Sequence, residues 1–290
     1  MFYILFTLPI LLFFLIAYFG STYLIARRTP DPATSPKDVG LDFEDVSFQS
    51  SDGLKLGGWY VPAIDSTRTI IVCSGANGSI DSDVNVLPWL HDAGFNVLMF
   101  DWRAHGRSAG SIVSLGYYER YDLIAAIEFA KAKGAHKIGV LGFSMGGSIA
   151  LSVAASDPSI DAVVADSAFV DVVSAVKGGL IERLPLALGA DTLAHLFLLT
   201  ASFRLGVRGF GADPLSTIDR IAPRPMLLLY GDRDPFVPSV EIDQLIARAG
   251  TSAEVWRVPE AAHRNLHELR SAEYRTKIVR FFDRNLDTRS

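Results

Sequence analysis

The chain has 290 residues and a formal net charge of −5, with 27 basic and 32 acidic side chains. This length fits one large α/β domain or two small ones, and the sequence shows no basic stripe, so nucleic-acid binding has no support. The single cysteine, Cys73, excludes an internal disulfide and is consistent with a reducing compartment.

The N-terminus is the most apolar part of the chain. Residues 1–26 carry no charged side chain, and residues 2–25 are almost wholly apolar. A helix of that length spans roughly 36 Å, which exceeds the hydrocarbon core of a bilayer, about 30 Å thick. The pattern predicts a transmembrane anchor over residues 1–26. A cleaved signal peptide and a buried helix are the alternatives. A signal peptide normally has basic residues before its apolar run, and this chain has none there.

Basic residues follow the apolar run, at Arg27, Arg28 and Lys37. By the positive-inside rule, this asymmetry favours a single-pass membrane protein whose remaining chain is cytoplasmic. Export after signal cleavage is the alternative. Residues 27–39 are rich in proline and polar side chains, which predicts a linker between the anchor and the rest of the chain.

Strand-like and helix-like segments alternate after the linker, and we expect residues 40–290 to form one domain. The predicted strands are 43–49, 54–61, 69–73, 96–101, 137–141, 160–165, 225–230 and 253–258; the predicted helices are 84–92, 117–133, 147–154 and 273–285. The first two strands form a hairpin around Ser51-Asp52-Gly53. Short apolar strands separated by helices indicate an α/β fold with a mostly parallel central sheet and helices on both faces.

Residues 169–213 interrupt the alternation. This segment has no strand-like run and is rich in leucine, alanine and glycine. It is interpreted either as extra helical core or as a helical cap insert over a functional site. Its position between two predicted strands favours the cap, which should then supply apolar walls to a pocket.

The run Gly142-Phe143-Ser144-Met145-Gly146 lies between the predicted strand 137–141 and the predicted helix 147–154. G-x-S-x-G in this context is typical of a nucleophile elbow, a sharp turn that presents the serine hydroxyl to a cleft. Ser144 is therefore the candidate nucleophile. The backbone N–H of Met145, at the start of a helix, can stabilise a developing oxyanion. A glycine-rich turn without function is the alternative.

A serine hydroxyl needs a base, and the base needs an orienting acid. The run Gly231-Asp232-Arg233-Asp234-Pro235-Phe236-Val237-Pro238 follows one predicted strand, and a loop that ends in His263 follows the last strand. The carboxyl ends of parallel strands meet at one edge of a sheet, so Ser144, Asp234 and His263 are expected to converge there.

Other titratable side chains remain as alternatives. Asp232 and Asp166 are the alternative acids, although loop spacing favours Asp234, and His267 is the alternative base. No two histidines have metal-ligand spacing with a carboxylate or cysteine nearby, so no metal and no cofactor is predicted. Cys73 is expected to be a small buried hydrophobe, with a reactive thiol near the site as the alternative. The remaining histidines are expected on the surface or in loops: His91, His105, His136 and His195.

With these motifs in order, residues 40–285 resemble the α/β-hydrolase fold, and more narrowly the membrane-anchored single-pass α/β-hydrolase-domain proteins of the serine-hydrolase class. The family's G-x-S-x-G matches residues 142–146, and its G-x-x-D-x-x-V-P acid loop matches residues 231–238. Its D-x-R-G-x-G turn is matched by Asp101-Trp102-Arg103-Ala104-His105-Gly106, with Ala104 in place of the first glycine. The resemblance implies a catalytic triad of Ser144, Asp234 and His263.

One departure concerns the second oxyanion donor. The family usually has His-Gly after its third strand, whereas this chain has Cys73-Ser74-Gly75-Ala76-Asn77-Gly78. The resemblance implies the backbone N–H of Ala76 as this donor. A backbone donor does not depend on the side chain, but Ser74 in place of histidine changes how the loop is supported.

The sequence thus predicts a membrane-anchored serine hydrolase with a cytoplasmic catalytic domain. It should cleave an ester or thioester with an apolar acyl group, through an acyl-enzyme on Ser144. The expected partners are a small or lipid-like acyl substrate and the membrane contacted by residues 1–26; the oligomeric state is left open. Residues 29–290 alone should be soluble and active. A serine peptidase, a non-catalytic binding module and a cofactor-free haloperoxidase-like enzyme are the alternatives.

Overall fold

The computed structural model describes residues 2–183, 189–210 and 212–287, with the side chains of residues 2–8 and 10 left out. Its centre is an eight-stranded sheet of order β1-β2-β4-β3-β5-β6-β7-β8. The two pairings that involve β2 are antiparallel and all others are parallel, which confirms the mostly parallel sheet. The strands are β1 (Glu44–Gln49), β2 (Lys55–Val61), β3 (Arg68–Cys73), β4 (Asn96–Phe100), β5 (Lys137–Phe143), β6 (Ala162–Asp166), β7 (Met226–Gly231) and β8 (Ala253–Val258).

The central strands are apolar along their whole length because both faces of the sheet are covered. Successive side chains point to opposite faces, so neighbours in one strand belong to different cores. In β3, Ile71 packs into one core with Leu98 of β4, and Ile70 packs into the other with Val97. All four side chains are completely buried.

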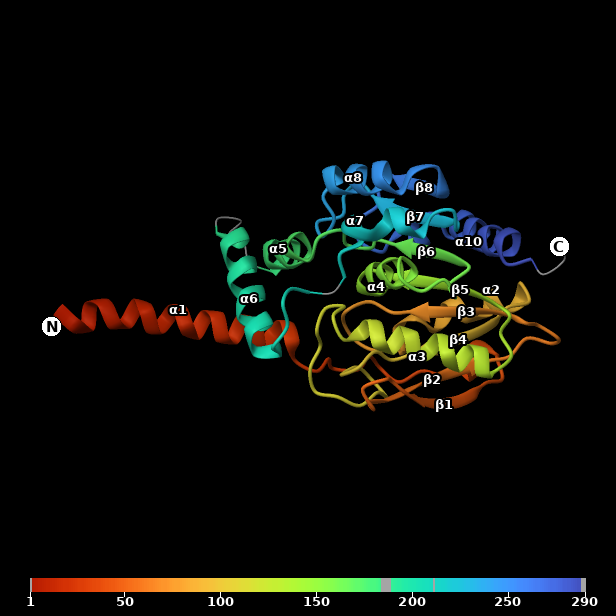
Figure 1. Cartoon of the computed structure of the whole chain (residues 1–290), viewed down its shortest axis with the longest axis horizontal. Helices are drawn as coiled ribbons and strands as arrows, with labels where there is room; N and C mark the ends of the chain where they lie inside the picture. The colour runs from red at the N-terminus through yellow and green to blue at the C-terminus, as the bar shows by residue number, and fades with distance from the viewer. Residues whose placement is uncertain (1, 184–188, 211, 288–290) are drawn as a thin grey trace.

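Helices cover the two faces, as Figure 1 shows. The face that includes Ile71 is covered by α3 (Glu119–Ala132), α4 (Met145–Ala154) and α8 (Ser239–Ala249), and the other by α2 (Leu87–Asp92) and α10 (Ser271–Asn285). Short helices connect them: η1 (Pro36–Val39), η2 (Ile80–Val86), α7 (Pro214–Thr217), η3 (Ile218–Ile221), η4 (Gly250–Ser252) and α9 (Leu266–Leu269).

Two helices, α5 (Val172–Arg183) and α6 (Ala190–Leu205), lie in the predicted cap insert between β6 and β7. They pack against each other near one end of the sheet, and α6 crosses the N-terminal helix α1 (Phe2–Ile25) (Figure 1). Residues 184–188 and 211 of the predicted insert lie outside the described residues.

The C-terminal half of α1 packs on the domain, whereas its N-terminal half extends away from it (Figure 1). Ala17, Ser21 and Ile25 recur every four residues and are buried, as expected for one face of a helix. Gly20 allows close approach to α6, because a Cβ there would overlap the ring of Phe197.

The structure does not support the transmembrane anchor that we expected over residues 1–26. Within the described part of the chain, no helix is both long enough and apolar enough to cross a membrane.

The segment 27–39, which we expected to be a linker, lies along the domain. The Arg27 guanidinium donates to the Ser108 carbonyl at 2.9 Å, and the Asp31 carboxylate accepts from the Ser79 backbone N–H at 2.8 Å. Both hydrogen bonds hold this segment against the sheet domain.

Candidate active site

Ser144 lies at the sharp turn between β5 and α4, with backbone angles φ 50° and ψ −117°. This conformation is unusual for a residue with a side chain and signals a constrained turn. The glycines on both sides permit it. A Cβ at Gly142 would overlap the backbone of Gly146, and a Cβ at Gly146 would overlap the Cys73 carbonyl oxygen. The motif thus provides the tight packing that a nucleophile elbow requires.

His263 joins Ser144 to Asp234. Its Nε2 lies 2.9 Å from Ser144 Oγ, and its Nδ1 lies 2.6 Å from Asp234 Oδ2. Asp234 is buried, and its second carboxylate oxygen accepts the backbone N–H of Phe236 at 2.8 Å. The three side chains come from loops that follow β5, β7 and β8, so the structure brings together the residues selected from the sequence. This is the geometry of a nucleophile, a base and an orienting acid.

The alternative acids have other partners. Asp232 pairs with Arg257 at 2.5 Å. Asp166 is buried at the end of β6, where it accepts the Tyr274 hydroxyl at 2.7 Å and the Ser167 hydroxyl at 2.9 Å. Both carboxylates are thus engaged away from His263.

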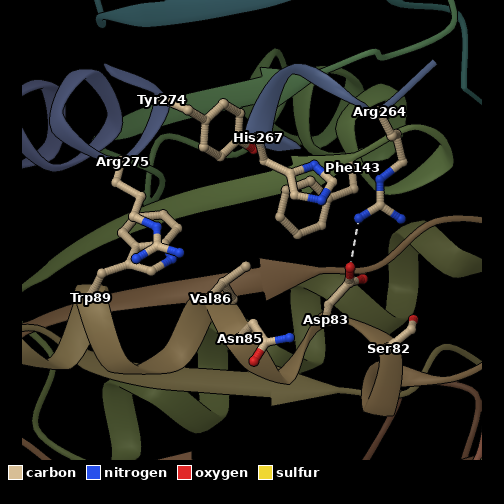
Figure 2. Close-up of a pocket in the computed structure, with 10 residues that line it drawn as sticks. All are labelled: Ser82, Asp83, Asn85, Val86, Trp89, Phe143, Arg264, His267, Tyr274 and Arg275. Carbon is tan, nitrogen blue, oxygen red and sulfur yellow. Dashed lines mark hydrogen bonds and ion pairs between the residues drawn. The ribbon is translucent and has the colours of Figure 1, made fainter. Parts of the chain in front are cut away.

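The alternative base His267 lies in α9 and is half exposed, with its ring 6.1 Å from that of Tyr274. It lines a different cavity, which Figure 2 shows. The ring that contacts Ser144 is therefore that of His263.

The turn after β3 passes beside the elbow. A Cβ on Gly75 would lie 3.7 Å from the Cβ of Ser144, and Ala76 lines the same cavity as Ser144. Met145, the other candidate oxyanion donor, is the first residue of α4. The backbone at Met145 and at Ala76 therefore flanks the serine, as an oxyanion hole requires.

Side chains from elsewhere support this turn. The indole N–H of Trp102 donates to the Ser74 carbonyl at 2.9 Å, and the Nε–H of Arg28 donates to the Ala76 carbonyl at 2.8 Å. The two bonds hold the turn after β3 in place, although this chain has Ser74 where the family usually has a histidine.

His105 lies in a loop, as expected, but it is completely buried. Burial lowers the pKa of His105, so the ring is neutral and carries one N–H. Its Nδ1 lies 2.8 Å from the Arg103 carbonyl, whereas its Nε2 lies 3.2 Å from the Ala76 carbonyl. A neutral ring can donate to only one of these carbonyls, whereas Arg28 donates to the Ala76 carbonyl whichever nitrogen of His105 carries the proton.

Ser144 and His263 open into a cavity of about 200 Å³. Its wall is mostly apolar and comes from the helices α5 and α6, from the end of α1 and from the loops that follow strands. Phe236 packs against His263, with the two ring centres 4.6 Å apart. The apolar lining side chains larger than alanine include Leu24, Leu115, Phe169, Val172, Val176, Leu180, Phe197 and Phe236.

Arg264, which follows His263, was not selected from the sequence. Its backbone N–H donates to Ser167 Oγ at 3.0 Å, and its guanidinium binds Asp83 at 2.6 Å and lies over the ring of Phe143. Figure 2 shows this ion pair at one end of a cavity of about 110 Å³. Only its position after His263 could have drawn attention to Arg264, because each partner is distant in the sequence.

Cys73 is completely buried at the end of β3, and burial raises the pKa of its thiol. Within the residues that the structure describes, no group of three or more His, Cys, Asp or Glu side chains could hold a metal ion.

Comparisons with known proteins agree with this architecture. Residues 68–185 match the family model described as the alpha/beta hydrolase fold. The chain is 30% identical to the protein YqkD of Bacillus subtilis over 265 residues, which cover 87% of this chain and 84% of YqkD. It is 27% identical over 224 residues to the alpha/beta hydrolase domain-containing protein WAV2 of Arabidopsis thaliana, covering 74% of this chain and 69% of WAV2.

Solved structures show the same similarity. The esterase Pf2001 of Pyrococcus furiosus superimposes with a TM-score of 0.78 and 26% identity, over 91% of this chain and 99% of that one. A putative aryl esterase of Burkholderia cenocepacia, 20% identical, has a TM-score of 0.63 over 84% of this chain and 99% of that one, which shows the fold alone. From the fold, the family model and these relatives, the chain belongs to the α/β-hydrolase family.

Proposed function

We propose that this protein is a serine hydrolase that cleaves an ester or thioester with an apolar acyl group, through an acyl-enzyme on Ser144. The fold and the similarity to the solved esterase Pf2001 support a hydrolase, and an esterase in particular. One observation supports the serine mechanism and the apolar acyl substrate. Ser144 Oγ contacts His263, His263 contacts Asp234, and Ser144 and His263 line an apolar cavity.

In the proposed reaction, Ser144 Oγ attacks the acyl carbonyl while His263 Nε2 takes its proton. The same proton then goes to the leaving group, which departs as an alcohol or thiol. Asp234 accepts the Nδ1–H of His263, which fixes the tautomer and stabilises the imidazolium. The N–H groups of Met145 and Ala76 receive the oxyanion. Water, deprotonated by His263, then attacks the acyl-enzyme. The bond between the acyl carbon and Ser144 Oγ breaks, His263 returns the proton to Ser144 Oγ, and the acid is released.

The cavity supports an apolar acyl group as the substrate's recognised part. Aliphatic and aromatic side chains dominate its wall, and burying a methylene there is worth about 0.8 kcal/mol. Carboxylates are absent from the residues described as lining it. Transfer of the acyl chain from water into this cavity therefore supplies binding free energy, and the chain does not have to cover a carboxylate in the wall.

The test is hydrolysis by the full-length protein of three substrates with the same acyl group. These are p-nitrophenyl butyrate, a butyryl thioester and a butyryl p-nitroanilide. We expect turnover of the ester and thioester by the natural protein, none by Ser144→Ala, and little cleavage of the anilide. Faster cleavage of the anilide would favour a peptidase. No turnover of any of the three, with a folded protein, would favour the binding module.

A further inference from the structure

The end of α1 lies in the wall of the catalytic cavity. Tyr23, Leu24 and Arg28 line it together with Ser144 and His263. We propose that the end of α1 and Arg28 are part of the active site: Tyr23 and Leu24 bound the acyl pocket, and Arg28 positions the oxyanion turn. This rests on the proposed function, since it takes Ser144 as the nucleophile.

Arg28 connects α1 to the oxyanion turn through one guanidinium. Its Nη1 donates to the Tyr23 carbonyl at 2.9 Å, its Nη2 to the Leu24 carbonyl at 2.7 Å, and its Nε to the Ala76 carbonyl at 2.8 Å. The last carbonyls of a helix have no partner within the helix and carry its negative dipole end, so a cation is favoured there. The rigid planar fork of arginine then fixes the distance between the helix end and Ala76.

The Ala76 carbonyl belongs to the peptide unit next to the one that carries the Ala76 N–H. Holding the carbonyl therefore limits the rotation of the backbone that aims the N–H at the oxyanion. Oxyanion donors work at about 2.7–3.1 Å from the charge, and a misplacement of about 1 Å can reduce the rate roughly 100-fold. Arg28 acts here through Ala76, so it is a positioning residue.

The end of α1 is itself fixed to the cap. Arg204 of α6 donates to Ser21 Oγ at 2.9 Å and to Thr22 Oγ1 at 2.7 Å. The ring of Phe197, which lines the cavity, occupies the space that a Cβ on Gly20 would fill. The helix end, the cap and the acyl pocket thus form one packed unit.

Arg27 provides a matched control because it has the same charge and the same kind of partner. Its guanidinium donates to the carbonyls of Ser108, Gly110 and Gly106, at 2.9, 2.8 and 2.7 Å. It holds the N-terminal segment to the domain, but none of these bonds reaches Ala76.

The first experiment compares Arg28→Gln, Arg28→Lys and Arg27→Gln in the full-length protein with p-nitrophenyl butyrate. For Arg28→Gln we expect kcat to fall roughly 10- to 100-fold with KM within about threefold, because the change acts on the transition state. Arg28→Lys should recover part of kcat, and Arg27→Gln should stay within about threefold of the natural enzyme. Fluorophosphonate labelling to completion in each variant shows that Ser144 and the fold are intact.

Two results would overturn the positioning role. If Arg27→Gln and Arg28→Gln lowered kcat equally, the effect would be merely structural. If both variants kept the kcat of the natural protein, Arg28 would have no part in positioning the turn. An inactive and unlabelled natural protein would instead remove the proposed function, and with it this inference. The two failures are therefore distinguishable.

The second experiment tests the acyl wall. Leu24→Trp should fill the pocket and lower kcat/KM for p-nitrophenyl octanoate, relative to p-nitrophenyl butyrate, by roughly tenfold. In a fitted pocket, one methylene changes kcat/KM by about 10- to 200-fold. Phe19→Trp is the matched control, because Phe19 lies on the same helix but is 65% exposed. An unchanged octanoate-to-butyrate ratio in Leu24→Trp would show that α1 does not bound the acyl site.

Discussion

Among single residues, the proposed acid Asp234 can be tested directly against the alternative acid Asp166. Asp234→Asn keeps the size of the side chain but favours the wrong tautomer of His263, so kcat should fall by roughly 10⁴. Asp166→Asn should stay within about tenfold of the natural enzyme, because Asp166 binds the hydroxyls of Tyr274 and Ser167. The measurement is kcat with a p-nitrophenyl ester. If Asp166→Asn lowered kcat far more than Asp234→Asn, the acid would be Asp166 at the end of β6.

The thiol of Cys73 should be inert in the folded protein. It is completely buried, and burial raises its pKa, so the reactive thiolate is scarce at pH 8. We expect no modification by iodoacetamide over an hour at pH 8 and complete modification in denaturing urea, both measured by intact mass. Rapid labelling of the folded protein, with loss of activity, would make Cys73 a functional thiol.

The sequence was sufficient to select the three side chains that the structure brings into contact at the candidate site. Ser144 was identified from its glycines, and Asp234 and His263 from their places after strands. Arg28 could not be identified in this way, because its contact with Ala76 joins positions 48 residues apart and depends on the path of α1. Arg264 escaped for the same reason, since its partner Asp83 is 181 residues away.

At the scale of elements, the contact between cap helix α5 and the acid loop is unusually close. A Cβ on Gly178 would overlap the carbonyl oxygen of Pro235 and lie 2.9 Å from the Cα of Phe236. Both are backbone atoms next to Asp234, so Gly178→Ala must displace the helix or the loop. We expect a lower melting temperature and at least a tenfold lower kcat/KM.

Gly179→Ala is the comparison for stability. A Cβ there would meet only side-chain atoms, at 3.2 Å from Arg183 Nη1 and 3.4 Å from Phe236 Cε1. Alanine is favoured over glycine in a helix by about 0.5–1 kcal/mol, so this variant should melt no lower than the natural protein. Equal melting temperatures for the two alanine variants would mean that α5 does not press on the acid loop.

The hairpin between β1 and β2 is tied to α3 through Arg103. This guanidinium binds Asp52 at 2.7 Å and Asp122 at 2.6 Å. The hydrogen bond from Arg103 lowers the pKa of Asp52 below its ordinary 3.8. A folded-state pKa below the unfolded value contributes stability above that unfolded value, and the contribution is lost as the pH falls through the folded pKa.

Asp52→Asn should therefore lower the melting temperature at pH 7, and the difference from the natural protein should shrink as the pH falls below about 3.8. Thermal unfolding followed by circular dichroism between pH 3 and 7 measures this difference. Asp52 is partly exposed, so the effect should be small. A difference that grows towards acid pH would contradict the assignment.

The predicted elements were reliable where the apolar pattern was continuous. The strand around Ile70 and Ile71 matches within a residue, since both faces of the sheet are covered. The predicted helix 84–92 is instead split into η2 (Ile80–Val86) and α2 (Leu87–Asp92). Pro88 explains the break, because proline fits the first turn of a helix but not its interior.

At the scale of the whole molecule, the order of strands and helices was sufficient to predict a parallel α/β sheet with the site at its carboxyl edge. The path of the N-terminus was not predictable in this way. A uniformly apolar run indicates a helix, but it does not specify what the helix contacts. The structure places the end of α1 against α6 and the catalytic cavity, so a chain starting at residue 29 lacks part of the cavity wall.

Ser144 should react as an activated nucleophile within this fold. The most direct measurement is the intact mass of the full-length protein after reaction with a fluorophosphonate, followed by mapping of the modified peptide. We predict one adduct per chain on Ser144, no adduct in Ser144→Ala, and a labelling rate reduced by at least 10³ in His263→Ala. A folded natural protein that remains unmodified, or an adduct on another residue, would show that Ser144 is not the activated nucleophile.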